Sequence, residues 1–92
     1  MNLNLTTPEK LKMKNFAQRV DKIITLIEKG FKEKEGEDWI QCIIIIDGEF
    51  EKAERDEVVA KYLLAGWKKV AHRTSSENNE RPGLTRFTFV AE

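Results

Sequence analysis

The feature that most constrains the fold is a run of four consecutive isoleucines, Ile43 to Ile46, inside an apolar stretch that begins at Trp39. The run is β-branched and presents apolar side chains to both faces of an extended chain, which is the pattern of a strand buried on two sides. Asp47 and Gly48 follow at once and predict the turn that ends the strand. We therefore expect this strand to lie in the middle of a sheet.

Two helices are predicted, one on each side of this strand in the sequence. The tripeptide Thr7-Pro8-Glu9 is a helix-start signal, because it offers a capping hydroxyl, a preset φ and a carboxylate at the positive end of the helix dipole. The apolar spacing that follows predicts an amphipathic helix ending near residue 35, before Gly36. A second helix is predicted from Glu51 to Ala65, with Gly66 as its left-handed cap. The apolar stripe of the first helix consists of Phe16, Val20, Ile23, Ile24, Ile27 and Phe31.

The C-terminal part of the chain predicts a hairpin. Lys68 to Thr74 and Leu84 to Val90 alternate as strands do, and the polar segment between them predicts a long tip. Because a strand-helix-strand unit joins parallel strands by a right-handed crossover, we expect the first two strands to be parallel and the third to be antiparallel to the second. The expected fold is α+β, in the order α-β-α-β-β, with a three-stranded mixed sheet packed by two helices. Residues 1–92 are expected to form one domain, with residues 1–6 flexible.

Composition narrows the classes of function. Sixteen basic and sixteen acidic side chains give no net charge, which argues against a protein that coats nucleic acid and against a DNA mimic. One cysteine and one histidine predict no internal disulfide and no Cys/His metal cluster, and they suit a reducing, cytoplasmic setting. No signal-peptide pattern is present, and the longest apolar run is far short of the roughly twenty residues that span a bilayer. We expect no metal, no cofactor and no membrane span.

Neither of the two lone reactive residues predicts a catalytic site. Histidine has an unperturbed pKa near neutrality, which suits a general base, but no nucleophile or orienting carboxylate lies near His72 in the sequence. Cys42 falls within the apolar strand, where a thiol is usually an inert, small hydrophobe. Carboxylates are numerous, yet so short a chain has little volume for the cleft that holds two of them together. The sequence therefore predicts a protein that is not an enzyme.

Charge is unevenly distributed along the chain. Residues 1–32 hold seven basic and three acidic side chains, residues 33–57 hold three and ten, and residues 58–92 hold six and three. The acidic middle either solvates loops and complements the second helix's N-terminus, or forms a patch that docks on a basic surface. The first helix also carries more apolar surface than one thin sheet covers, which favours self-association. The candidate interface residues are Met13, Leu26, Phe31, Glu37 and Asp38.

The hairpin concentrates guanidinium, amide and hydroxyl groups, which are the groups that bind phosphate. Alternation places Phe87 and Phe89 on one face of the last strand, and Arg86 and Thr88 on the other. Whether Arg73 meets Arg86 depends on a register that the sequence leaves open. The alternative interpretation is an ordinary solvated hairpin. The candidate anion-binding residues are Lys68, Arg73, Arg81 and Arg86.

The layout of the chain resembles a known group of proteins. A capped first helix, an apolar strand, a helix that ends in KYLLAGWKKV and a final LTRFTFV strand are similar to the small α-β-α-β-β proteins encoded by bacteriophages. The resemblance covers most of the chain and depends on this layout and on the junction from Leu64 to Lys68. It implies an accessory or host-takeover protein that acts by binding, often as an oligomer.

These observations lead to two expectations of function. The first is a small, non-enzymatic, cytoplasmic binding protein that acts by protein-protein contact or sequestration and forms a homo-oligomer. The alternative is a nucleotide or nucleic-acid binding module that uses the basic C-terminal hairpin.

Overall fold

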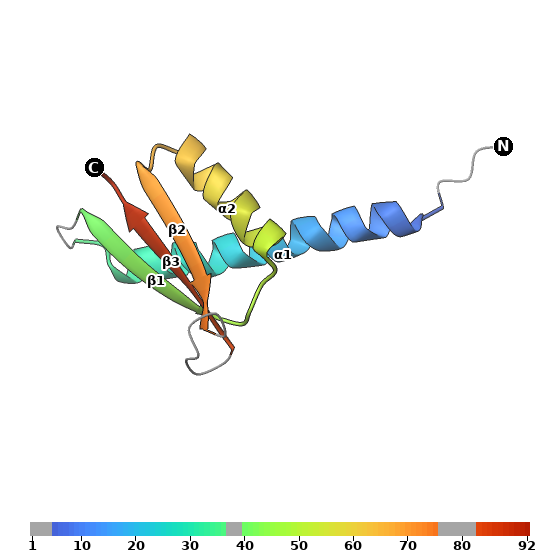
Figure 1. Ribbon diagram of the computed structural model, residues 1–92, viewed down its shortest axis with the longest axis horizontal. Coiled ribbons are helices and arrows are strands. Elements are labelled where there is room, and N and C mark those ends of the chain that lie inside the picture. The colour runs from blue at the N-terminus through green and yellow to red at the C-terminus, as the bar shows by residue number, and fades with distance from the viewer. Residues whose placement is uncertain (1–4, 37–39, 76–82) are drawn as a thin grey trace.

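A computed structural model describes residues 5–36, 40–75 and 83–92 of the chain. It contains two helices and three strands in the predicted order (Figure 1). Residues 1–6 are predicted to be flexible, and most of them lie outside the described residues. The elements are α1 (Pro8–Glu33), β1 (Gln41–Asp47), α2 (Lys52–Leu64), β2 (Lys69–Thr74) and β3 (Leu84–Val90).

The three strands form one antiparallel sheet in the order β1-β3-β2. The α+β class and the element order are confirmed, but the predicted mixed sheet is wrong. β1 and β2 do run in the same direction, yet β3 lies between them and pairs antiparallel with both. The hairpin keeps β3 beside β2, and the free side of β3 then pairs with β1, which gives a split β-α-β arrangement.

The isoleucine strand β1 is consequently at an edge, and the prediction that it lies in the middle of the sheet is wrong. Its residues alternate between exposed and buried along its whole length. Ile44 and Ile46 are buried, whereas Ile43 and Ile45 remain 45% and 60% exposed. A β-branched apolar run is thus compatible with an edge strand whose second face is bare, because periodicity alone does not report what covers each face.

The helix α1 begins as predicted. The Thr7 hydroxyl accepts a hydrogen bond from the Lys10 amide at 3.1 Å, and Pro8 occupies the first turn. The helix ends at Glu33, two residues before the predicted end, and Gly36 has a φ of +87°. Gly30 lies inside the helix, at a point where it passes close to β1.

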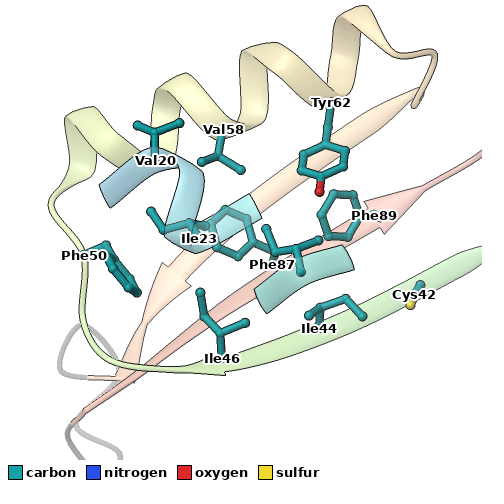
Figure 2. Close-up of a cluster of buried hydrophobic side chains, with 11 residues drawn as sticks. Val20, Ile23, Cys42, Ile44, Ile46, Phe50, Val58, Tyr62, Phe87 and Phe89 are labelled. Carbon is teal, nitrogen blue, oxygen red and sulfur yellow. The ribbon is translucent and has the colours of Figure 1, made fainter. Parts of the chain in front are cut away.

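The core lies between the helices and one face of the sheet (Figure 2). Directly opposed residues of the three strands share a face, and one such face carries Ile44, Phe87 and His72 in a row. α1 packs against β1, α2 packs against β2, and the helices pack against each other. The buried apolar residues are Val20, Ile23, Ile27, Cys42, Ile44, Ile46, Phe50, Val58, Tyr62, Phe87 and Phe89.

An aromatic group closes the end of this core. Gly66 adopts a φ of +115°, which confirms the predicted left-handed cap of α2. Trp67 follows and stacks on Phe31, with ring centroids 5.3 Å apart, while Phe89 packs edge-on against Phe31 at 4.8 Å. These contacts bring α1, the α2-β2 junction and β3 together.

Candidate interaction surfaces

The first half of α1 extends beyond the rest of the molecule (Figure 1). We define the arm as Pro8–Arg19. None of its side chains is fully buried, and the buried positions of α1 begin at Val20. Leu11 and Met13 are 49% and 72% exposed. The arm therefore presents apolar side chains that the described part of the chain leaves largely uncovered.

A groove of about 830 Å³ lies between the arm and the start of α2. Met13, Phe16 and Val20 contribute apolar surface from α1, and Glu51 and Glu57 contribute carboxylates from the α2 side. Its full lining is Lys12, Met13, Asn15, Phe16, Ala17, Arg19, Val20, Asp21, Glu51, Glu54, Glu57 and Lys61.

A partly buried ion pair joins the two helices at this groove. Arg19 Nε lies 2.7 Å from Glu54 Oε2, and the Glu54 side chain is only 4% exposed. Glu54 Oε1 also accepts the Glu51 backbone amide at 3.0 Å, so one carboxylate both caps α2 and binds α1. The arrangement ties the end of the arm to the first turn of α2.

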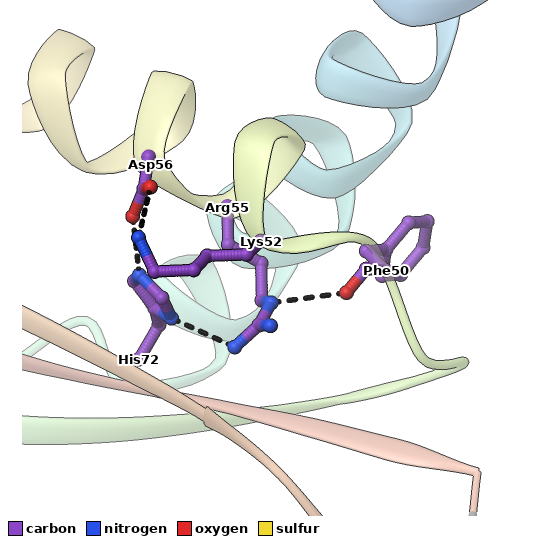
Figure 3. Close-up of polar contacts among 5 residues, drawn as sticks. All are labelled: Phe50, Lys52, Arg55, Asp56 and His72. Carbon is purple, nitrogen blue, oxygen red and sulfur yellow. Dashed lines mark hydrogen bonds and ion pairs between the residues drawn. The ribbon is translucent and has the colours of Figure 1, made fainter.

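The lone histidine joins α2 to β2 (Figure 3). His72 Nδ1 lies 2.9 Å from Arg55 Nη1, and His72 Nε2 lies 2.8 Å from Asp56 Oδ1. Because a guanidinium is always protonated and can only donate, Nδ1 accepts from Arg55 and the ring proton is on Nε2, where it is donated to Asp56. Arg55 Nε donates to the Phe50 carbonyl at 2.9 Å. Both imidazole nitrogens are therefore occupied in holding the fold.

Two further groups near the core have shifted pKa values. The Lys52 ammonium, 2.8 Å from Asp56 Oδ2, and then His72 lower the pKa of Asp56. Burial, followed by the nearby Glu28 carboxylate, raises the pKa of Tyr62. The Tyr62 hydroxyl donates to Glu28 Oε2 at 3.1 Å, which ties α2 to α1.

The face of the sheet away from the helices carries a second hollow, of about 310 Å³. The register places Arg73 directly opposite Arg86, which answers the question that the sequence left open. Ala71 pairs with Thr88 in the next row, and Lys69 pairs with Val90 in the row after that. The full lining is Gln41, Lys69, Ala71, His72, Arg73, Arg86, Thr88 and Val90.

Of the predicted anion-binding residues, the structure therefore brings Arg73 and Arg86 together. Lys68 is exposed and lies just before β2, outside this hollow. Arg81 lies outside the described residues. Lys69 and Thr88 were not singled out as ligands by sequence reasoning, and strand alternation alone would have placed both on the face of Arg73 and Arg86 once the register was known.

The predicted interface residues separate into different places. Met13 lies on the arm and lines the groove. Leu26 is partly buried near β1, and Phe31 belongs to the aromatic group at the end of the core, so neither joins Met13 in one patch. Glu37 and Asp38 lie outside the described residues.

Among residues 5–36, 40–75 and 83–92, no group of three or more His, Cys, Asp or Glu side chains is placed to hold a metal ion. No helix in these ranges is both long and apolar enough to cross a bilayer. No protein-family model matches the chain, and neither a curated protein nor a solved structure is significantly similar to it.

Proposed function

We propose that the chain is a small non-enzymatic binding protein that acts by protein-protein contact and self-associates through the arm. The observation that supports this most is the arm itself, which is about 18 Å of helix at 1.5 Å per residue. A helix of this length is marginal in water unless an apolar face packs against something. A partner that covers Met13 and its neighbours would supply that packing.

The groove beside the arm suits a second copy of the same chain. One wall is apolar, from Met13, Phe16 and Val20, and the α2 side carries the Glu51 and Glu57 carboxylates. The arm carries four basic side chains and one acidic side chain. An arm from another copy therefore complements the groove in apolar surface and in charge.

Symmetry also favours the arm of a second copy as the occupant of the groove. The arm and the groove are neighbouring parts of one surface, since Lys12, Met13 and Phe16 belong to both. When one copy places its arm in the groove of another, a two-fold axis also places the arm of the second copy in the groove of the first. Both arms are then covered in a closed dimer.

The biological setting is part of the proposal. Cys42 is buried and takes part in no disulfide, which suits a reducing cytoplasm. The similarity in layout to phage-encoded accessory proteins stays a prediction, as does the steric or sequestering role that it implies. In that role, a dimer would cover a partner through surface that its own contact leaves open.

The test is the mass of the protein in solution. We expect sedimentation equilibrium to give a mass of two chains for the native protein, and a mass of one chain for Met13→Glu. Leu64→Glu is the matched control, because Leu64 is 89% exposed on α2 and does not line the groove. Added salt is expected to weaken the dimer, because screening reduces the attraction between the arm and the carboxylates.

Two results would overturn this proposal. One is a native protein that stays monomeric up to the highest concentration at which it remains in solution. The other is a dimer that both glutamate variants dissociate equally, which would place the contact elsewhere. Circular dichroism of Met13→Glu checks that the variant keeps its helices, as expected for a substitution at an exposed position.

A further inference from the structure

We propose that the hollow on the bare face of the sheet binds the phosphate of a small phosphorylated molecule of the nucleoside monophosphate class. This site is independent of self-association, because it lies on the face of the sheet that the helices leave uncovered. It is argued from the register, the charges and the size of the hollow.

The register builds the hollow from three rows of side chains. Arg73 and Arg86 form the first row, and Lys69 with Val90 forms the third. Alternate residues along a strand are about 7 Å apart, so the first and third rows are about 13 Å apart at their Cα atoms, a gap that long arginine and lysine side chains can reach into from both ends. Ala71 and Thr88 form the middle row, and their small side chains leave the space between the longer ones.

The charged side chains in the described lining of this space are cationic. Lys69, Arg73 and Arg86 line it, and its described lining includes no carboxylate. Asp47, the acidic residue on this face of β1, pairs with Leu84 one row beyond Arg86 and does not line the hollow. Arg73 takes part in another interaction within the chain, so Arg86 and Lys69 supply the charge on which the proposal depends.

Arginine suits this role because its guanidinium binds two oxygens of a phosphate at once, while lysine contributes a point charge. Arg86 lies on this face of β3 and Lys69 lies on the same face of β2. A dianionic phosphate held between them is attracted by both cations. Thr88 lines the hollow between these cations, and a threonine hydroxyl can donate to a third oxygen.

The size and surroundings of the hollow indicate the rest of the ligand. A volume of about 310 Å³ is at the lower end of the range for small-molecule sites, which favours a mononucleotide over a dinucleotide. Ile43 is exposed beside Thr88 in the same row, and Ile45 is exposed beside Arg86. These side chains offer an apolar surface on which a flat base can lie once its phosphate is held.

The test is isothermal titration calorimetry. The separate probes are adenosine monophosphate, adenosine, inorganic phosphate and a single-stranded oligonucleotide. We expect the monophosphate to bind more tightly than phosphate alone, and adenosine to bind least. Arg86→Gln is expected to weaken binding by at least about tenfold, since a charge-assisted hydrogen bond contributes that much. Lys68→Gln is the matched control and is expected to leave binding unchanged, because Lys68 does not line the hollow.

A second variant separates shape from charge. Ala71→Leu fills the middle row without altering any charge, and Ala71 is exposed, so the fold tolerates it. We expect it to abolish binding. The proposal is overturned if no probe binds, if Lys68→Gln weakens binding as much as Arg86→Gln, or if Ala71→Leu binds normally. Binding of the oligonucleotide alone, weakening steeply with salt, would assign the surface to nucleic acid instead. Neither set of outcomes depends on the Met13→Glu result.

Discussion

At the scale of single residues, His72 is committed to the fold by its two charged neighbours. Arg55 must donate to one ring nitrogen, so the other carries the proton and donates it to Asp56. Proton transfer during catalysis needs a ring nitrogen that faces a substrate. The contacts of His72 instead make it a bridge between α2 and β2.

Asp56 makes the stability of this bridge dependent on pH. The pKa of Asp56 is lowered in the folded protein by Lys52 and then by His72. Ionised Asp56 therefore stabilises the fold above the ordinary carboxylate pKa, and this stabilisation is lost as pH falls through the lowered pKa. We predict that native protein and Asp56→Asn differ in free energy of unfolding at pH 7 and converge once the pH falls below the lowered pKa of Asp56. Urea denaturation across this range measures the difference.

Glu57→Gln is the control for this prediction. Glu57 lies on the same helix and has a longer ion pair, 3.8 Å, with Lys61. Its substitution is expected to change the stability of the monomer little at any pH, as is usual for exposed pairs, so the two variants are compared at concentrations at which the chain is monomeric. A difference between native protein and Asp56→Asn that stays constant from pH 7 to pH 2 would contradict the proposed linkage.

The sequence could not have shown this group of residues. Asp56 and His72 are sixteen positions apart, and they meet only because α2 packs against β2. Arg73 and Arg86 could be placed on one face by alternation, but their pairing needed the register. In both places the missing information was how elements pack, which no local pattern carries.

At the scale of elements, local sequence signals predicted where helices and strands begin and end, but they did not predict how these elements pack together. The start of α1, the left-handed Gly66 and the bounds of β3 follow from capping, glycine chemistry and alternation. The order of the strands does not, because no local pattern shows which strand lies in the middle of the sheet. The hairpin holds β3 beside β2 in either order, and β1 pairs with β3 instead of with β2.

Gly30 shows how closely two elements approach. A Cβ added there would lie 3.0 Å from both Ile44 Cδ1 and Ile44 Cγ2, which is tighter than ordinary contact. Alanine would gain about 1 kcal/mol of helix propensity. It would also overpack the core, at a cost of about 1–3 kcal/mol. We predict that Gly30→Ala is destabilising by about 1 kcal/mol.

A double-mutant cycle checks the cause of this loss. Ile44→Val removes Cδ1, so Gly30→Ala should cost less in the Ile44→Val background than in the native one. Urea denaturation of the four proteins gives the coupling. Strict additivity, or a Gly30→Ala variant that is more stable than the native protein, would show that the close contact is not limiting.

At the scale of the whole molecule, α1 is one helix with two different environments. Val20, Ile23 and Ile27 are buried, whereas the arm contacts the rest of the molecule through Phe16 and the Arg19–Glu54 ion pair near its end. In a monomer, opening the arm therefore breaks fewer buried contacts than opening the core half of α1, and its opening free energy is much smaller. The molecule measures 59 × 31 × 20 Å largely because the arm projects from it (Figure 1).

We predict that hydrogen exchange resolves these two halves. At low concentration, amides of residues 12–19 are expected to exchange much faster than those of residues 23–31, although all lie in the same helix. Raising the concentration is expected to slow exchange in the arm alone, as a second copy covers it. Equal protection along α1 at low concentration would mean that the arm is stable without a partner.

The position of β1 also affects what happens when the protein is heated. In the described part of the chain this strand pairs on one side only, with β3. Ile43 and Ile45 are exposed beside its unpaired edge. An apolar strand with a free rim is a template for adding strands from other molecules. If α1 detaches first, its departure uncovers Ile44 and Ile46 as well. Thermal unfolding should then end in precipitation, with a midpoint set by scan rate and not by equilibrium.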